Sequence, residues 1–341
     1  MQTRFLEYIF GLLLTLKYVL FSVFIYAQEP EQERQPNKET DARALEISRE
    51  IFSRQTAIRN IQNDIGIFDQ SLIEAYRDMA RFYTELEDYE NATQFYIEAL
   101  QIARINTGLY SYEQISILDS LIASNISADK WQEADNFHEL SYLINSRLYA
   151  DANLKYLQAA ETYGAWKLRL VRENLLEQSG FSLLNTAEEL SQFYERAIER
   201  LEFSSEVKAE HLLKIIYGKS QVDLTLARSV AATPYTAFEG TERPYINQTR
   251  CQNVRNSQGQ VVRQCYSVQV ENPRYRISQR DAKQFALQRH TRDISSSIAK
   301  LEEIKNTSSE LSNAEKQQIE LQISELVTES EQLVRSTRRL L

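Results

Sequence analysis

Apolar residues recur at intervals of three and four along most of the chain after Ala42. This spacing places side chains on one face of a helix. We therefore predict that a first helix, or a pair of helices, begins at Ala42 and ends near Gly66. The apolar positions of this first series are Leu45, Ile47, Ile51, Ile58 and Ile61.

Two unrelated markers then recur with the same period of 42 residues. Gly66 and Gly108 are each followed by an aromatic residue two positions later, a polar break and the start of an apolar helix pattern. Ala92 and Ala134 form the second marker, in DYENATQFY and KWQEADNFH. A fixed period is typical of antiparallel helix pairs that bury their apolar sides by stacking on their neighbours.

The first unit resembles the signature of the tetratricopeptide repeat family, in its longer variety of 42 residues. The matching residues are Tyr76, Met79, Ala80, Tyr83, Tyr89, Ala92, Tyr96 and Ala99. The resemblance implies a mainly α fold over residues 42–231, an α-solenoid of tetratricopeptide-like helical hairpins. Its best units are 64–105 and 106–148.

The later units depart from the family pattern. The second has Asn125 and His138 where the family favours aromatic residues. In the third, Gly164 lies in phase, but Lys167 replaces an expected aromatic. Phe193, Tyr194 and Ala197 imitate a second-helix pattern, so a fourth, degenerate hairpin is predicted around 185–197. The residues of the second unit that fit the family are Leu118, Leu121, Trp131 and Ala134.

In the family, the first helix of each hairpin lines a concave groove that takes peptides or helices, so the resemblance implies a protein or peptide partner. An ordinary solvated face is the alternative interpretation. In the first unit the groove residues would be Glu74, Arg77, Arg81 and Thr84. In the second they would be Ser116, Asp119, Ala123 and Ile126.

Two patterns resemble capping boxes beyond these units, Asn185 with Glu188 and Ser278 with Asp281. They predict helix starts near 186 and 279. A further helix is predicted from Glu206 to Ala231, because Pro234 cannot continue it.

The helical rhythm breaks over residues 232–277, which we predict to be a loop and a β-hairpin. Val262, Tyr266, Val268 and Val270 alternate with polar residues, as in a half-buried strand. A three-residue turn that ends at Gly259 sets Val254 opposite Val262 and Cys251 opposite Cys265. An even pair of cysteines in an exported chain predicts a disulfide. A two-ligand metal site is the alternative, but no histidine or third cysteine lies nearby.

Residues 278–341 predict an antiparallel helical hairpin or coiled coil, with a turn at KNTSS and Ser312 and Glu315 as the cap of the last helix. Pairing between chains through 308–341 is the rival interpretation. The first helix carries Ile294, Ile298 and Leu301, and the heptad seam of the second carries Ile319, Ile323, Leu326, Leu333 and Leu340.

The N-terminus predicts a signal peptide over residues 1–27, cleaved after Ala27, and then a disordered polar leader over 28–41. Arg4 precedes two apolar runs that close on Ala27. An uncleaved anchor is the alternative, but Lys17 falls near its middle, where a cation is costly in lipid. We therefore expect an exported protein without a stable membrane span, periplasmic if the organism is Gram-negative.

Composition narrows the function classes. Only 8 Gly and 5 Pro among 341 residues favour long helices over a turn-rich sheet. The net charge of -9 repels phosphate backbones, so no nucleic acid partner is predicted. No known catalytic motif is found, and the three histidines, His138, His211 and His290, are far apart in sequence.

The sequence therefore favours a binding scaffold or adaptor of the cell envelope, with no catalytic residue, metal or cofactor assigned. Two alternatives stay open. One is an envelope enzyme whose chemistry lies in the C-terminal half, for instance where His211 and His290 meet. The other is a structural protein that oligomerises through its C-terminal heptads.

Overall fold

The computed structural model describes residues 38–149, 153–204 and 206–340. Two compact units divide the chain, residues 1–56 and 57–341, and helix α2 (Lys38–Asp64) runs from the first into the second. The predicted signal peptide, its cleavage point after Ala27 and leader residues 28–37 lie outside the described residues. The end of the predicted leader is wrong, because 38–41 already belong to α2. Lys38 and Glu39 are good helix formers, which explains the earlier start.

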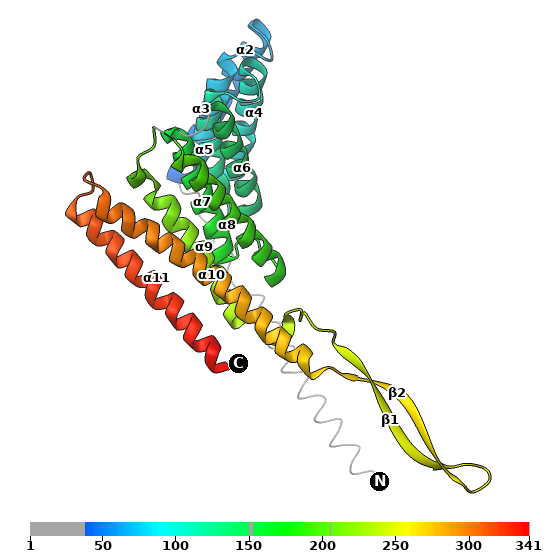
Figure 1. Cartoon of the computed structure of the whole chain (residues 1–341). Helices are drawn as coiled ribbons and strands as arrows, with labels where there is room; N and C mark the ends of the chain where they lie inside the picture. The colour runs from blue at the N-terminus through cyan, green and yellow to red at the C-terminus, as the bar shows by residue number, and fades with distance from the viewer. Residues whose placement is uncertain (1–37, 150–152, 205, 341) are drawn as a thin grey trace, which may run out of the picture. The chain divides into compact units, whose positions relative to one another are not determined.

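The second unit is mainly helical (Figure 1). Helices that follow one another in sequence pack against each other through α9. Their bounds are α3 (Ser71–Glu85), α4 (Tyr89–Thr107), α5 (Tyr112–Ser127), α6 (Trp131–Leu148), α7 (Leu154–Glu173), α8 (Gly180–Glu202) and α9 (Leu213–Ala232).

The turns between α3 and α4 and between α5 and α6 have one geometry, 42 residues apart. Glu87 and Asp129 occupy the same place in them, with φ of 59° and 55°. In both turns the next backbone N–H donates to a carbonyl five residues earlier at 2.9 Å. Ala92 and Ala134, the markers of the second helices, are both completely buried. The repeated sequence markers therefore correspond to a repeated local structure.

The third helix pair loses this phase. α7 begins at Leu154, 42 residues after the start of α5, but it continues until Asn174 ends it in the left-handed region at φ 47°. α8 then begins at Gly180, where the Ser179 hydroxyl accepts the Ser182 N–H. The predicted hairpin around 185–197 and the predicted helix start near 186 are wrong, because these residues continue α8. A cap at Ser179 already satisfies the helix terminus.

Helices α7, α8 and α9 approach closely around one buried tyrosine. A Cβ on Gly164 would lie 2.6 Å from the Tyr194 ring, and a Cβ on Gly218 would lie 2.7 Å from its hydroxyl. Only glycine leaves room for this ring on both sides. The position of Gly164, in phase with buried Ala80, is thus explained by helix packing.

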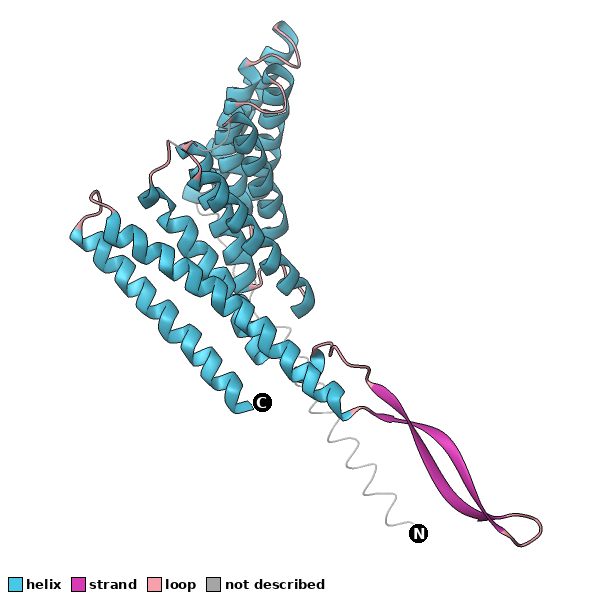
Figure 2. Cartoon of the chain, viewed as in Figure 1, coloured by secondary structure: helices cyan, strands magenta, loops and turns pink. Residues whose placement is uncertain are grey.

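The hairpin consists of β1 (Tyr245–Arg255) and β2 (Val261–Glu271), coloured magenta in Figure 2. The predicted register is confirmed: Val254 pairs with Val262, and Cys251 with Cys265, which form a disulfide. The prediction of a half-buried strand is wrong, because the side chains of both faces are mostly exposed. The alternation of apolar and polar residues gives the hairpin two chemically different faces, but most side chains of both faces stay exposed.

Helix α10 (Pro273–Thr307) returns from the hairpin and packs along α9. It begins at Pro273, with the Asn272 side chain accepting the Arg274 N–H at 3.1 Å, so the predicted start near 279 is wrong. Proline suits the first helical position because its missing N–H would have no partner there. Ser278 lies inside the helix and donates to the Tyr275 carbonyl.

Helix α11 (Asn313–Leu340) forms the predicted C-terminal helical hairpin with α10. The capping box is confirmed: the Ser312 N–H donates to the Glu315 carboxylate at 2.8 Å, and the Glu315 N–H donates to the Ser312 hydroxyl at 3.3 Å. The seam residues Ile319, Ile323 and Leu326 are buried in one core with α9 and α10. The chain therefore covers this part of its own heptad seam.

Candidate binding site: a tyrosine-lined cavity

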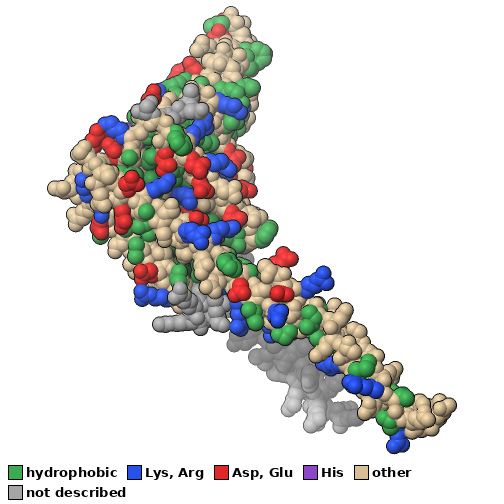
Figure 3. Space-filling view, in the orientation of Figure 1, with side chains coloured by type: hydrophobic (Ala, Val, Ile, Leu, Met, Phe, Trp, Pro, Cys, Tyr) green, Lys and Arg blue, Asp and Glu red, His purple; other side chains and the backbone are tan. Residues whose placement is uncertain are grey.

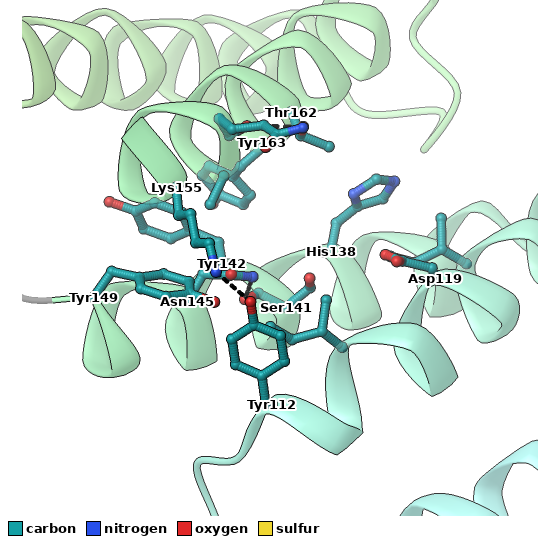
Figure 4. A pocket seen from close by; sticks show the side chains of 14 residues that line it. Tyr112, Asp119, His138, Ser141, Tyr142, Asn145, Tyr149, Lys155, Thr162 and Tyr163 are labelled. Carbon is teal, nitrogen blue, oxygen red and sulfur yellow. Dashed lines mark hydrogen bonds between the residues drawn. The ribbon is translucent and has the colours of Figure 1, made fainter. Parts of the chain in front are cut away.

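A cavity of about 400 Å³ lies between α5, α6 and α7 (Figure 4). It combines aromatic rings with short polar side chains and one lysine. From α5 the lining residues are Tyr112, Ile115, Asp119 and Ile122, and from α6 they are His138, Ser141, Tyr142 and Asn145, with Tyr149 directly after the end of α6. From α7 they are Lys155, Gln158, Ala159, Thr162 and Tyr163.

One end of the cavity is built around Lys155. Its ammonium donates to the Tyr112 hydroxyl and lies 4.7 Å from the centre of that ring and 5.1 Å from the centre of the Tyr149 ring. The hydrogen bond to Tyr112 raises the pKa of Lys155, so the ammonium stays charged. Among the described residues, Lys155 contacts a hydroxyl group and aromatic rings rather than a carboxylate.

The wall between α6 and α7 is a stack of aromatic rings. Tyr142 and Tyr163 stack at 4.8 Å, and Phe193 of α8 meets both rings edge-on at 5.3 and 5.1 Å. The hydroxyls of Tyr142 and Tyr156 are 3.1 Å apart. Rings that support one another lose little freedom when a ligand binds, so this wall is preorganised.

His138 lies at the opposite end of the cavity from Lys155 (Figure 4). Its ring stacks on Trp166 at 4.4 Å, and its buried Nε2 has no hydrogen-bond partner among the described residues. Burial lowers the pKa of His138 to about 4, with the nearby Lys167 adding to the effect and Asp135 opposing it. The imidazole is therefore neutral near pH 7.

Behind His138, a buried ion pair holds α6 and α7 together. Asp135 accepts from the Trp166 indole at 3.0 Å and from the Lys167 ammonium at 2.8 Å. Lys167 also donates to Glu139 at 2.7 Å. The lysine that interrupts the expected aromatic pattern is thus a structural residue, because it neutralises a buried carboxylate.

Of the predicted groove residues, Asp119 lines this cavity. Partial burial raises the pKa of its carboxyl, although one edge of the side chain stays exposed. Ser116 and Ala123 are exposed and do not line the cavity, and Ile126 packs against the cluster of Ala134, Trp166 and Leu170. The inward line on α5 is therefore Tyr112, Ile115, Asp119 and Ile122.

The predicted residues of the first unit form a surface charge cluster on α3. Arg81 pairs with Glu74 at 2.8 Å and Asp78 at 3.5 Å, and Arg77 lies 3.7 Å from Glu74. The Thr84 hydroxyl donates to the Ala80 carbonyl of its own helix. These charges are largely satisfied within α3.

Sequence reasoning missed most of the cavity. The predicted groove residues come only from first helices, whereas α6 contributes His138 and Tyr142. The His138 ring both stacks on Trp166 and lines the cavity. The available signal was the spacing of four between His138 and Tyr142, which puts both on one helical face.

The other two histidines lie in separate surroundings. His290 is 4% exposed in α10, and its charged neighbours include Arg289, Asp293 and Glu188. His211 lies at the short turn before α9, beside a different cavity lined by Glu161 and Glu310. No described contact joins the two histidines.

No protein-family model matches the chain, and no curated protein is similar to it. Among the described helices, none is both long and apolar enough to cross a membrane. In the same residues, His, Cys, Asp and Glu form no group of three that could hold a metal ion.

Proposed function

We propose that this protein is an exported, tetratricopeptide-type scaffold that binds a peptide segment of a partner protein in the cavity between α5, α6 and α7. The observation that carries the proposal is the tyrosine-lined cavity with Lys155 at one end. Tyrosines offer a rigid apolar surface and a hydroxyl at low entropic cost, which suits protein recognition. Lys155 supplies a cation for an acceptor group of the peptide.

The surrounding architecture supports this proposal. The identical turns of the first two helix pairs agree with a repeat array, in which stacked hairpins present an extended surface. The cavity uses residues of two successive first helices, α5 and α7, and of the second helix between them. Such a surface can follow a peptide across more than one repeat.

Export is supported by two independent features. The N-terminal sequence has the charged start, apolar run and small closing residue of a signal peptide. Cys251 and Cys265 form a disulfide, which persists in oxidising compartments. Both features agree with a protein of the cell envelope.

The proposal is tested by panning a phage-displayed random peptide library on the purified protein. Enriched peptides, synthesised with a fluorescent label, are measured by fluorescence polarisation. Tyr112→Ala and Lys155→Ala should each weaken binding by roughly tenfold, as expected when one central contact is removed. Lys130→Ala removes a lysine at the α5–α6 turn that does not line the cavity, and it should leave binding unchanged.

Enriched peptides that bind all four proteins equally would contradict the cavity as the site. Glu74→Ala and Arg81→Ala extend the test to α3. A loss of affinity in these variants as well would show that the bound peptide reaches the first unit.

A further inference from the structure

The β-hairpin presents one apolar face, and no other described strand pairs with either of its edges. In an antiparallel pair, alternate positions of each strand face the same side. The apolar side chains of one face come from both strands: Ile246, Val254, Val262, Tyr266, Val268 and Val270. Figure 3 shows hydrophobic and basic side chains along this segment. Ile246, Val262 and Tyr266 are 44%, 41% and 44% exposed.

Hydrogen bonds at the two ends of the hairpin define which backbone groups face outward. The Asn256 N–H donates to Gln260, and the Asn272 N–H donates to Pro244, both at 2.9 Å. Bonded and non-bonded pairs alternate along an antiparallel ladder, and the register is unbroken between these ends. Thr249 and Ser267 therefore form a non-bonded pair, and their N–H and C=O groups point away from the hairpin.

The two outer edges differ in charge. β1 carries Arg250 and Arg255 and no acidic residue. When two copies of β1 lie antiparallel at full overlap, Arg250 faces Arg250 of the partner subunit, which is repulsive. β2 instead carries Arg263 and Glu271, placed symmetrically four residues before and four residues after Ser267.

We propose that β2 pairs antiparallel with β2 of a second copy of this chain, with the two-fold axis at Ser267. In this register Arg263 lies opposite Glu271 of the partner subunit, and the same pair forms twice. The backbone groups of Ser267 and of every second residue on either side of it face away from β1. In this register these residues form the hydrogen-bonded pairs between the two β2 strands. The backbone pattern therefore permits this register, and the charge pattern favours it over the other registers that the backbone permits.

The pairing also joins the apolar faces. In this register, residues of the apolar face of one β2 lie opposite residues of the apolar face of the other, so that Tyr266 lies opposite Val268 of the partner subunit. Both apolar faces therefore remain on one side of a continuous four-stranded sheet. An isolated two-stranded hairpin is marginal in water, and additional strands stabilise it. Within one chain Glu271 pairs with Arg276, but both side chains are mostly exposed, so this ion pair is easily rearranged.

The base of the hairpin is held firmly, which reduces the entropy lost on pairing. The Asn272 amide donates to the Arg243 carbonyl at 2.9 Å. Gln279 of α10 donates to the carbonyls of Thr236 and Phe238 at 3.1 and 2.9 Å. These hydrogen bonds tie the base of the hairpin to the start of α10.

Sedimentation equilibrium of the purified protein tests the proposal. Wild type should dimerise, and Arg263→Glu and Glu271→Arg should each raise the dissociation constant by roughly tenfold, because each sets like charges opposite one another. The double variant restores both pairs and should return the constant to about the wild-type value. Arg255→Glu, on β1, is the matched control and should have no effect.

Ser267→Pro tests the backbone pairing independently. It removes an outward N–H at the centre of the proposed interface, and Thr249→Pro removes its counterpart on the β1 edge. Dimerisation should be lost in the first variant and kept in the second. A wild-type protein that stays monomeric up to about 100 μM, or charge reversals without rescue in the double variant, would overturn the proposal. If Ser267→Pro disturbs the hairpin itself, the charge-reversal series decides.

Discussion

At the scale of single residues, His138 is the side chain whose chemistry most clearly departs from its sequence context. The tetratricopeptide pattern expects an aromatic ring at this position, and the imidazole behaves as one by stacking on Trp166. Its Nε2 has no hydrogen-bond partner among the described residues, and burial lowers its pKa. The site therefore favours the neutral imidazole over the protonated form. At acidic pH, histidine at this position therefore lowers the free energy of unfolding, whereas phenylalanine would not.

The pH dependence of stability follows from the direction of this shift. The pKa of His138 falls from 6.5 in the unfolded chain to about 4 in the folded protein. Above 6.5 both states are neutral, and as the pH falls towards 4 the unfolded chain binds a proton that the folded protein excludes. The free energy of unfolding therefore decreases over this range.

We predict that His138→Phe reduces this acid destabilisation by about 1 kcal/mol between about pH 7 and pH 5, a figure lowered for the partial exposure of the ring. The measurement is urea unfolding of both proteins at the two pH values. His290 also has a lowered pKa, but it contributes equally to both proteins and cancels in the comparison. Equal losses in both would show that His138 is not responsible.

At the scale of elements, the hairpin depends on its disulfide rather than on a core. Its two strands bury little side-chain surface, whereas α9 and α10 share a continuous apolar core. The disulfide closes a loop with a sequence separation of 14 residues. Such a loop contributes roughly 3 kcal/mol in the chain-entropy model.

We predict that replacing Cys251 and Cys265 by serine loosens β1 and β2 while α9 and α10 stay folded. Hydrogen exchange read by mass spectrometry should show faster exchange in 245–271 and unchanged exchange in 213–232. Acceleration in both segments would mean that the hairpin supports the helical core.

The capping signals show how far local sequence determines an element. Ser312 with Glu315 forms the predicted cap because no stronger start signal precedes it. The similar pattern at Asn185 fails because Ser179 starts the helix first, and that at Ser278 fails because Asn272 and Pro273 do. A capping motif therefore starts a helix only where no residue upstream has already started it.

At the scale of the whole molecule, α11 completes the core of the C-terminal half. Ile319, Ile323 and Leu326 are 5%, 5% and 0% exposed, and they share one apolar cluster with α9 and α10. A heptad pattern by itself indicates only that a helix needs a partner. Here α9 and α10 of the same chain supply that partner.

We predict that Leu326→Ala lowers the free energy of unfolding by about 2 to 5 kcal/mol, since it leaves a cavity in this core. Removal of residues 308–341 should expose α9 and cause aggregation, as seen by light scattering, rather than a simple change from dimer to monomer. A truncated protein that stays soluble, with its remaining helices still folded, would instead support the role of an oligomerisation stalk.

The sequence by itself determined the helical class, the 42-residue period of the first two helix pairs, the hairpin register, the disulfide and the last helix cap. Each of these depends on interactions between residues near in sequence or on one strict period. Tertiary structure decided the rest. The cavity needs side chains from α5, α6 and α7 together, and the inward face of α5 is set by how that helix rotates against its neighbours. Likewise, the pattern of β2 could not show that its apolar face stays uncovered, because burial depends on what packs against a strand and not on the strand alone.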